Sequence, residues 1–545
     1  MHKNRARFAL ALSIELVVMS AALTPISAAR AQAVAEARVH VDEFRVTGNT
    51  LLSESLIQGV LAPYKGDRNL TELKAAATAL QSLYVAQGWG GVIAYVPPQD
   101  GPPGVVTLAV LEGHITRVVV LGQTRDSIER VRRSLPKLKE GETPRPAQLD
   151  AQVMLANQNP ARQLAVTLEP GATQGEIEAH ITVTEQPNSR WSVGVDNTGT
   201  KQTGRSRANL SWQGADVAGL DDTLSLQAQI APQHLSRVAV LSAGWRLPIY
   251  SAGLTLDLMA AYSDVDGGTT STVAGPLQFS GKGEVFGAHL SGLLPRWGEA
   301  TQRLSAGVDH RVYLNNCSIT GLPDGACGSS GASVAVTPLQ FDYQLQQPVQ
   351  GSSPGYSLSL SAAANMNIGG PHGRPADFQA VRPGSDPDYK VLRANAMAQL
   401  PLPADWQLSL RAAGQATDAG LVPGEQFGLG GANAVRGYEE REITGDEAVF
   451  GSAELYGPDL AHALSKRIDH LRFLAFADGG RAWNHLGSAC LGAQTSCKLA
   501  SVGLGSRLAA GSFQLKLDLA AALKSGTLTE RHDVFLHVQA SYDFQ

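Results

Sequence analysis

The sequence predicts a membrane β-barrel of about 16 antiparallel strands, preceded by two small α+β domains. Three observations predict this fold: an N-terminal export signal, one module pattern that occurs twice, and alternating apolar and polar residues that continue to the C-terminus. The composition agrees, because charged residues make up only 17% of the 545 residues and glycine occurs 57 times. Soluble domains carry about 25% charged residues. The net charge of −5 gives no reason to expect a nucleic-acid partner.

Residues 1–31 are predicted to be a signal peptide. The basic residues Lys3, Arg5 and Arg7 precede a mostly apolar run at 8–23, and residues 29–31 form a small-residue cleavage site. A membrane anchor is the alternative, but the apolar run is shorter than the ~20 residues that a spanning helix needs. We therefore expect an exported protein.

Four cysteines form two close pairs, and each pair lies in a Gly/Ser-rich segment. In an exported protein this arrangement predicts two local disulfides, Cys317–Cys327 and Cys490–Cys497. Closing such a short loop contributes roughly 2–3 kcal/mol to stability by the chain-entropy estimate. A metal site is the weaker alternative, because neither pair has the C-x₂₋₄-C spacing of zinc sites and no histidines cluster nearby. No metal is expected.

Two copies of one module are predicted over residues 39–114 and 115–187. The first copy reads as a strand closed by Gly48 and Asn49, helices at 51–61 and 70–87, and strands at 91–96 and 105–111. The second copy repeats this order, with strands at 115–120, 162–170 and 176–185 and helices at 126–135 and 146–157. An exposed strand edge in such a module would accept a strand from an unfolded polypeptide. A role as a spacer is the alternative.

From residue 188 to 545, helical patterns give way to alternating runs of about ten residues, which predict a closed barrel. Sixteen strands are predicted, beginning near Arg190, Arg205, Thr223, Arg237, Leu254, Gly283, Arg303, Ala335, Tyr356, Lys390, Gln407, Val449, Arg472, Val502, Phe513 and Val534. Short connections alternate with long ones, as periplasmic turns alternate with external loops. The expected location is the outer membrane of a Gram-negative cell, with the two modules in the periplasm.

Tryptophans lie near the ends of the predicted strands. They are Trp191, Trp212, Trp245, Trp297, Trp406 and Trp483. Aromatic side chains at both membrane interfaces would form the girdles of a barrel. A soluble β-sandwich or solenoid is the alternative, and the export signal and the even strand number argue against it.

The candidate functional site combines a loop motif with a strand motif. The glycine-rich segment 428–438 ends in Val435, Arg436, Gly437 and Tyr438, within a predicted loop of about residues 418–447 that is the sixth external loop. Phe476, Asp478 and Gly480 share one face of the thirteenth strand.

We predict that Arg436 binds Asp478 inside the barrel. A carboxylate facing lipid would be costly, so Asp478 should face the lumen. Arginine can bind a carboxylate with two parallel hydrogen bonds, and Gly437 would let the backbone approach the wall. A merely flexible loop is the alternative. A phosphate-binding loop is excluded, because the Gly-Lys-Ser/Thr ending is missing.

The modules resemble POTRA (polypeptide-transport-associated) domains, through Phe44, Val46, Gly48 and Asn49 in the first and Pro170, Gly171 and Gly175 in the second. Nearly the whole mature chain is similar to two-partner secretion transporters, the haemolysin activation/secretion and filamentous haemagglutinin exporters. The resemblance implies an outer-membrane pore that recognises a large haemolysin-like or adhesin-like exoprotein and translocates it from the periplasm to the cell surface. It also implies a lumenal sixth loop whose Arg436 contacts Asp478.

The implied partners are a large secreted protein bound by the POTRA domains, outer-membrane lipid, and the barrel-assembly machinery. The C-terminal strand, with Phe544 next to last, is similar to the signal that this machinery reads. No cofactor, nucleotide, nucleic acid or catalytic residue is implied, and no Gly-x-Ser-x-Gly or His-Glu-x-x-His motif indicates an enzyme.

Two questions stay open. A factor of the same superfamily that assembles and inserts other outer-membrane proteins is the alternative function. Relatives often carry a plug helix before the first POTRA domain, but only residues 32–38 separate the expected cleavage site from the first strand here. The sixth loop is therefore the candidate for closing the resting pore.

Overall fold

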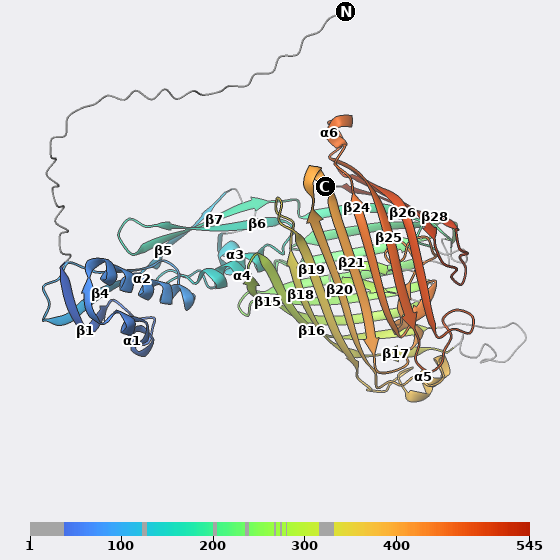
Figure 1. Ribbon diagram of the computed structural model, residues 1–545. Coiled ribbons are helices and arrows are strands. Elements are labelled where there is room, and N and C mark those ends of the chain that lie inside the picture. Colours follow the sequence, from blue (N-terminus) through green and yellow to red (C-terminus); the bar gives the residue numbers. More distant parts are fainter. Residues whose placement is uncertain are drawn as a thin grey trace, which may run out of the picture. The chain divides into compact units, whose positions relative to one another are not determined.

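The computed structural model describes residues 37–122, 128–199, 204–234, 239–265, 269–272, 275–278, 281–314 and 332–544 (Figure 1). The predicted signal peptide and the Cys317–Cys327 pair lie outside the described residues. The chain divides into two compact units, one formed by residues up to 83 with 94–110, the other by residues 84–93 with 111–545. Each unit is described by itself.

The first module is a four-stranded sheet with two helices. Its elements are β1 (Arg38–Thr47), α1 (Glu54–Leu61), η1 (Ala62–Tyr64), β2 (Gly66–Asn69), α2 (Leu70–Ala86), β3 (Val92–Tyr95) and β4 (Gly104–Glu112), and the strand order is β2-β1-β4-β3. Phe44, Ile57, Leu80 and Leu108 are fully buried in its core. Strand β2 was not predicted, because its four residues, GDRN, are too few and too polar to show alternation.

The second module repeats the two helices but has three strands. Its elements are β5 (His114–Leu121), α3 (Ile128–Arg133), α4 (Pro146–Ala156), β6 (Arg162–Pro170) and β7 (Glu176–Glu185), in the order β5-β7-β6. Ile115, Val131, Leu149, Leu164 and Ile181 belong to one buried apolar cluster between sheet and helices. Among the described residues, no helix combines the length and apolarity needed to cross a bilayer.

The remaining chain forms a closed antiparallel barrel, which confirms the predicted fold class. Its strands are β8 (Ser189–Asp196), β9 (Arg207–Ala215), β10 (Thr223–Ile230), β11 (Ala239–Ile249), β12 (Leu254–Val265), β15 (Gly281–Trp297), β16 (Ala300–Leu314), β17 (Val334–Val336) with β18 (Pro338–Gln347), β19 (Gly355–Asn365), β20 (Lys390–Pro401), β21 (Gln407–Thr417), β24 (Glu447–Tyr456), β25 (His470–Trp483), β26 (Ser496–Ala510), β27 (Phe513–Ala522) and β28 (Val534–Phe544). Strands β17 and β18 both pair with β16 and make one strand interrupted at Thr337, so the barrel has the sixteen predicted strands.

The barrel closes where its last strand pairs with its first. Residues of β28 from Gln539 to Phe544 pair with β8 from Asp196 to Trp191. Strand β26 begins at Ser496, earlier than the predicted Val502, because Cys497 and its neighbours belong to the strand rather than to the loop before it.

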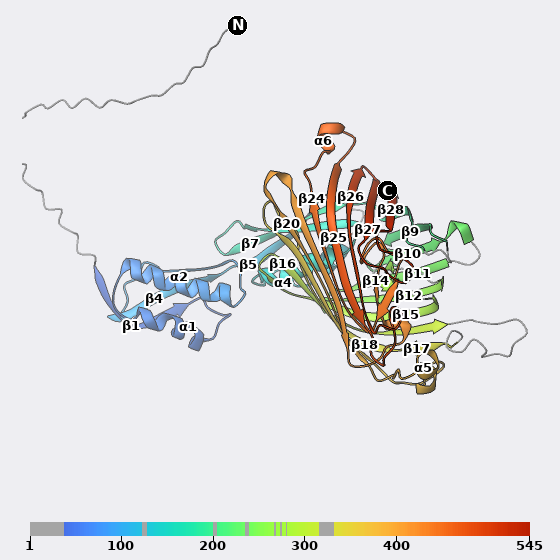
Figure 2. The same cartoon turned by 45° about the vertical axis from the view of Figure 1, so that its right-hand side comes forward.

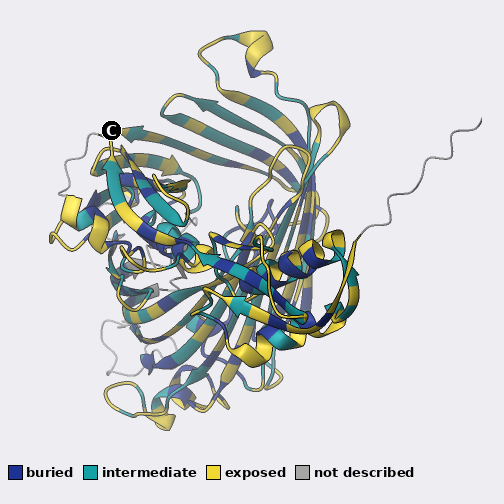
Figure 3. Ribbon diagram, turned by 90° about the vertical axis from the view of Figure 1, so that its left-hand side faces the viewer, coloured by how far each residue is buried: buried dark blue, intermediate teal, exposed yellow. Residues whose placement is uncertain are grey.

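Residue burial alternates along the barrel strands, as the sequence predicts (Figure 3). On β8, Trp191, Val193 and Val195 are exposed on the outer face, whereas Ser192 and Gly194 are half-buried on the lumenal face. The outer face is therefore apolar and suited to lipid.

The two ends of the barrel differ (Figures 1 and 2). Helix α5 (Pro375–Val381) and β17 lie at the end where the long loops gather, and α6 (Ala461–Leu464) lies at the other end, in a turn. The barrel begins at Ser189 and ends at Phe544 on the side of the turns, which is the periplasmic side.

The tryptophans gather mainly at the periplasmic end. Strand positions place Trp191, Trp212, Trp245, Trp297 and Trp406 near periplasmic turns, and Trp483 near an external loop. The predicted girdle is therefore rich in tryptophan at one interface, where indole rings can contact both headgroups and acyl chains.

The assignment of the two barrel faces predicts that substitution by arginine has different effects on stability at two neighbouring residues of β10. Leu226 is 43% exposed on the outer face, and Gln227 faces the lumen. Leu226→Arg is expected to destabilise the barrel by about 2–4 kcal/mol, because it places a cation in lipid. Gln227→Arg is the matched control and should stay within about 0.5 kcal/mol of wild type. Urea unfolding in lipid vesicles measures both, and equal losses would contradict the assignment.

Candidate functional site: the sixth external loop

The loop between β21 and β24 turns back into the barrel. A small hairpin of β22 (Phe427–Leu429) and β23 (Ile443–Gly445) forms its stem, with Phe427 paired to Gly445 and Leu429 to Ile443. The tip, residues 430–442, contains the predicted motif. Since Arg436 at this tip is 0% exposed, the tip is packed against the wall rather than extended into solvent.

Arg436 binds Asp478 of β25 through three donors. Nε donates to Oδ2 at 2.7 Å, Nη2 donates to Oδ1 at 2.8 Å, and the backbone N–H donates to Oδ2 at 3.1 Å. The guanidinium therefore meets the carboxylate in the planar two-bond geometry that gives arginine pairs their specificity. Asp478 is also buried, so the pair is screened little by water.

The same guanidinium contacts two further carboxylates and an aromatic ring. Nη1 lies 2.7 Å from Glu454 Oε1 of β24 and 3.5 Å from Asp518 Oδ1 of β27. Cζ lies 3.5 Å from the centre of the Phe476 ring, a cation–π distance. One arginine of the loop thus binds side chains from three strands of the wall.

Cations of the wall balance the additional carboxylates. Arg507 Nη1 of β26 lies 2.8 Å from Asp518 Oδ1, and Arg411 Nη2 of β21 lies 3.7 Å from Glu454 Oε1. Burial by itself lowers the pKa of Arg436, but the hydrogen bond to Asp478 and the nearby carboxylates raise it above its ordinary value. Arg436 is therefore permanently charged, and loss of one partner of such a buried pair costs about 3–5 kcal/mol.

Gly437 is required by both conformation and space. Its φ of +89° lies in the region that favours glycine, and a Cβ there would lie 3.2 Å from Ala520 Cβ. Its N–H donates to His537 Nε2 of β28 at 3.0 Å. The glycine lets the loop backbone come close enough to the wall for Arg436 to reach Asp478.

Val435 and Tyr438 fix the tip by packing. Both are fully buried and belong to one apolar cluster with Leu429, Phe450 and Leu499. The Tyr438 hydroxyl lies 2.8 Å from the carbonyl oxygen of Ala500 and 2.7 Å from that of Lys524, and donates to one at a time. Each residue of the Val-Arg-Gly-Tyr motif thus has a separate contact with the wall.

The strand motif supplies the complementary surface. Asp478 receives the arginine, Phe476 supplies the ring beneath it, and Gly480 leaves room for the loop, since a Cβ there would lie 2.7 Å from Leu429 Cδ2. The structure therefore brings all seven predicted loop and wall residues together: Val435, Arg436, Gly437, Tyr438, Phe476, Asp478 and Gly480.

A second set of contacts ties the first arm of the loop to the other side of the barrel. Glu425, 3% exposed, accepts hydrogen bonds from Arg311 of β16 at 2.9 and 3.1 Å, Arg393 of β20 at 3.1 Å and Tyr313 of β16 at 2.7 Å. Burial by itself raises the pKa of Glu425, but the two arginines and the hydrogen bonds from Tyr313 and Arg311 lower it well below its ordinary value.

Asp446, at the end of the loop, makes a third anchor. It is fully buried and binds both terminal nitrogens of Arg382, which follows α5. It also accepts from the backbone N–H of Leu421 at 2.9 Å and of His485 at 2.8 Å. The carboxylate therefore joins both arms of the sixth loop to the loops on either side of it.

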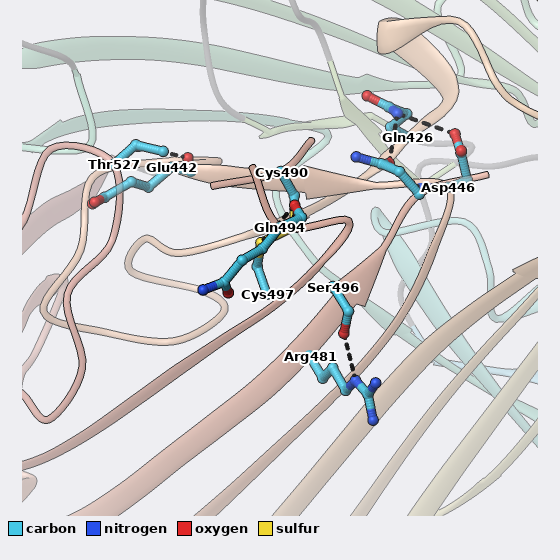
Figure 4. The surroundings of a disulfide bond; sticks show 10 residues. Gln426, Glu442, Asp446, Arg481, Cys490, Gln494, Ser496, Cys497 and Thr527 are labelled. Atoms are coloured by element: carbon cyan, nitrogen blue, oxygen red, sulfur yellow. Dashed lines mark hydrogen bonds between the residues drawn. A yellow bond between two sulfur atoms is a disulfide. The ribbon is translucent and has the colours of Figure 1, made fainter. Parts of the chain in front are cut away.

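The Cys490–Cys497 disulfide lies beside the sixth loop. The two sulfurs are bonded, and Figure 4 shows them near Gln426, Glu442 and Asp446 of that loop. Cys497 is buried in the same apolar cluster as Val435 and Tyr438. The cross-linked loop thus supports the tip from the external side.

The wall formed by β8 to β11 differs from the wall that holds the tip. The middle of its lumenal face carries neutral amide and hydroxyl side chains, which lie beside one another across the paired strands, whereas charged residues occupy the two ends of the same face: Arg190, Asp196, Arg207 and Arg246. The neutral residues are Ser192, Asn209, Ser211, Gln213, Ser225, Gln227, Gln229 and Ser242. The middle of this wall is therefore neutral and polar, and the sixth loop packs instead against the charged residues of β24, β25 and β27.

Sequence reasoning missed the anchors of the loop arms and two carboxylates around Arg436. Glu425 and Asp446 are charged residues that flank the glycine-rich tip. Glu454 and Asp518 are carboxylates at lumen-facing positions of strands with an alternating pattern. The sequence therefore contained a signal for each of the four. Their partners carried none, because Arg311 lies 114 residues from Glu425 and Arg382 lies 64 residues from Asp446.

Comparisons with known proteins cover most of the chain. The profile of the haemolysin secretion/activation protein family ShlB/FhaC/HecB matches residues 175–508, a range that contains both Arg436 and Asp478. The profile of the ShlB-type POTRA domain matches residues 39–113.

Relatives with similar sequences are transporters. The outer membrane transporter CdiB of Dickeya dadantii (strain 3937) is 24% identical over 453 residues, which cover 81% of this chain and 76% of the relative. The heme/hemopexin transporter protein HuxB of Haemophilus influenzae is 24% identical over 486 residues, covering 88% of this chain and 82% of the relative. The solved structure of CdiB from Escherichia coli has the same fold, with a TM-score of 0.76, 20% identity, and coverage of 96% of this chain and 93% of that chain.

The buried ion pair predicts that Arg436→Ala releases the loop tip without unfolding the barrel. Hydrogen exchange in peptides from residues 428–442 should accelerate by an amount that corresponds to about 3–5 kcal/mol, because three carboxylates lose their shared cation. Arg481→Ala is the matched control, since Arg481 lies on β25 but is exposed. In a double-mutant cycle with Asp478→Ala, additive effects would contradict the pairing.

The disulfide predicts that loss of the cross-link destabilises the same tip. Cys490→Ser with Cys497→Ser should reduce local stability by roughly 2–3 kcal/mol, and exchange should rise in the tip as well as in the cross-linked loop. The reason is that Cys497 shares one apolar cluster with Val435 and Tyr438. Exchange that rises only between residues 484 and 496 would show that the disulfide does not support the tip.

Proposed function

We infer the function from the premise that this chain belongs to the haemolysin secretion/activation protein family ShlB/FhaC/HecB, whose profile matches residues 175–508. It is an outer-membrane transporter of two-partner secretion, with POTRA domains in the periplasm. We propose that its cargo is a large haemolysin-like or adhesin-like exoprotein that crosses the barrel from the periplasm to the cell surface.

The observation that carries this proposal is the loop held inside a closed barrel by an ionic contact. Arg436 and Asp478 join a segment that is not part of the wall to a segment that is. Breaking this contact would leave the hydrogen-bond pattern of the barrel intact, so the loop can move while the wall persists. Movement of the loop within an unchanged barrel wall can close and open the pore.

The proposed path follows from the distribution of charge in the lumen. The sixth loop packs against the charged residues of β24, β25 and β27, and the middle of the wall formed by β8 to β11 offers neutral groups such as Ser211, Ser225 and Gln227. An extended polypeptide can exchange hydrogen bonds with such groups without a requirement for its own charge. Folding of the exoprotein outside the cell would supply the direction of transport, and no nucleotide is part of the proposal.

We further propose the binding step. The exoprotein would add a strand to an exposed sheet edge of the POTRA domains, which requires main-chain hydrogen bonds and little specific sequence. The first module presents β2 and β3 as the edges of its sheet, and the second presents β5 and β6. Membrane insertion by the barrel-assembly machinery and contact with outer-membrane lipid belong to the same proposal.

The alternative function, assembly of other outer-membrane proteins, is not favoured by any specific contact described above. The matching family is one of transporters rather than enzymes, and its profile covers the barrel from β8 into β26. The alternative predicts that depletion of the protein lowers the amounts of other barrels, which the following experiment also measures.

A paired expression test addresses the proposal. The transporter is produced with a large exoprotein from a neighbouring gene, if one exists, with and without residues 39–187, and the exoprotein is assayed in medium and periplasm. We expect exoprotein in the medium only with the full chain, because the deletion removes the proposed binding edges. The outer membrane is assayed for the folded barrel as a control.

Two outcomes would contradict the proposal. Equal secretion without residues 39–187 would remove the binding role of the POTRA domains. No secretion in either case, combined with loss of other barrels on depletion, would favour the assembly factor.

A further inference from the structure

The first periplasmic turn of the barrel, between β9 and β10, holds a buried carboxylate. Asp221 has a φ of +63°, which favours Asp, Asn and Gly, and its side chain is 4% exposed. Hydrogen bonds within the turn fix its shape: the N–H of Asp221 donates to Asp216 Oδ1 at 3.1 Å, and that of Ala218 donates to Asp222 Oδ1 at 2.9 Å. The turn therefore presents Asp221 in a defined direction.

Donors from two other segments converge on Asp221. Arg162, the first residue of β6, forms an ion pair with Oδ2, and its side chain is 2% exposed. Asn159 donates from Nδ2 to Oδ1 at 3.2 Å, and the Tyr250 hydroxyl donates to Oδ2 at 3.0 Å. Asn159 and Arg162 belong to the second POTRA domain, whereas Tyr250 belongs to the next periplasmic turn, between β11 and β12.

Apolar packing accompanies the polar contacts. The Tyr250 side chain packs against the core cluster of the second POTRA domain, which contains Leu149 and Leu164. Its ring is thus held by the domain while its hydroxyl is held by the barrel turn. Gln158 and Thr255 add a side-chain hydrogen bond of 3.3 Å beside it.

Ion pairs that are more exposed surround this buried centre. Arg296, before the turn between β15 and β16, binds Asp150 of α4 with distances of 2.6 and 3.2 Å, and these side chains are 37% and 41% exposed. Arg130 of α3 pairs with Asp216. All these contacts go to the first three periplasmic turns, which connect β9 to β10, β11 to β12 and β15 to β16.

Burial makes the centre different from its surroundings. An exposed pair such as Arg296 with Asp150 contributes about 0–1 kcal/mol, because water screens both charges. Removal of one member of a buried arginine–carboxylate pair destabilises a protein far more, because the remaining buried charge is left without compensation. Removal of the Asp221 charge would leave Arg162 uncompensated in the closed joint, and opening the joint to water would relieve this cost. The intact pair is therefore compatible with a closed, dry joint, whereas loss of either charge favours an open one.

We propose that Asp221 is a positioning residue that docks the second POTRA domain onto the first periplasmic turns and holds both as one rigid body during transport. This inference rests on the proposed function. A polypeptide bound by the POTRA domains is then delivered to a fixed sector of the barrel entrance, beneath β9 to β16. Asp221 acts through Arg162 and Tyr250 and does not contact the transported chain.

The test measures docking and transport separately in the full-length protein. Asp221→Asn keeps the size and the left-handed backbone preference of the residue but removes its charge. Hydrogen exchange of the purified protein should rise about ten-fold or more in peptides that contain residues 159–165 and 248–256, with residues 428–442 unchanged. Secretion of the exoprotein should fall by a similar factor.

Two further variants make the test specific. Arg296→Ala removes an exposed contact of the same joint and should leave exchange and secretion at wild-type values. The Arg162→Gln/Asp221→Asn variant removes both buried charges. If this variant docks tightly and secretes normally, the two charges serve only to neutralise each other. That result would overturn the positioning role of Asp221.

The remaining outcomes are also decisive. Unchanged exchange in Asp221→Asn would overturn the docking role, and looser docking with normal secretion would overturn the role in transport. If the wild-type protein secretes no exoprotein, the proposed function fails, whereas the exchange data still decide whether Asp221 docks the domain.

Discussion

The interaction between Arg436 and Asp478 is the constraint on which the lumen depends. A buried arginine is stable only where carboxylates meet it with good geometry, and here the nearest carboxylate belongs to a barrel strand. The external loop must therefore enter the barrel, Gly437 must clear Ala520, and Gly480 must leave room for Leu429. Each glycine in the two motifs follows from the position of this one pair.

Different strands hold the tip and the first arm of the loop, so the position of the loop depends on the arrangement of these strands. Glu425 connects the first arm to β16 and β20, whereas Arg436 connects the tip to β24, β25 and β27. A change in the distance between these walls would strain one set of contacts. The buried centre at Asp221 lies at the turns of β9 to β12, which belong to neither set, so movement of the second POTRA domain can reach the loop through the sheet.

The sequence predicted what local pattern determines and missed what distant pairing determines. Sixteen strands were predictable because alternation by two has no other common cause over so long a region. Arg436 and Asp478 could be paired because each is a lone charge in an unusual place. Strand β2 has too few residues for a pattern, and the partners of Glu425, Asp446 and Asp221 lie on segments far away in the sequence. The concentration of tryptophan at one interface follows from where the strands begin and end.

The neutral middle of the wall formed by β8 to β11 has a consequence for how easily a chain slides through the pore. A chain that slides past fixed charges would stop at each opposite charge, since a close pair in a confined lumen is attracted more strongly than in bulk water. Side chains such as Ser211, Gln213 and Gln227 instead offer hydrogen bonds that water can replace at little cost. Successive positions of the chain are then nearly equal in energy. Such a surface suits the passage of many different sequences at similar speed, because it retains none of them.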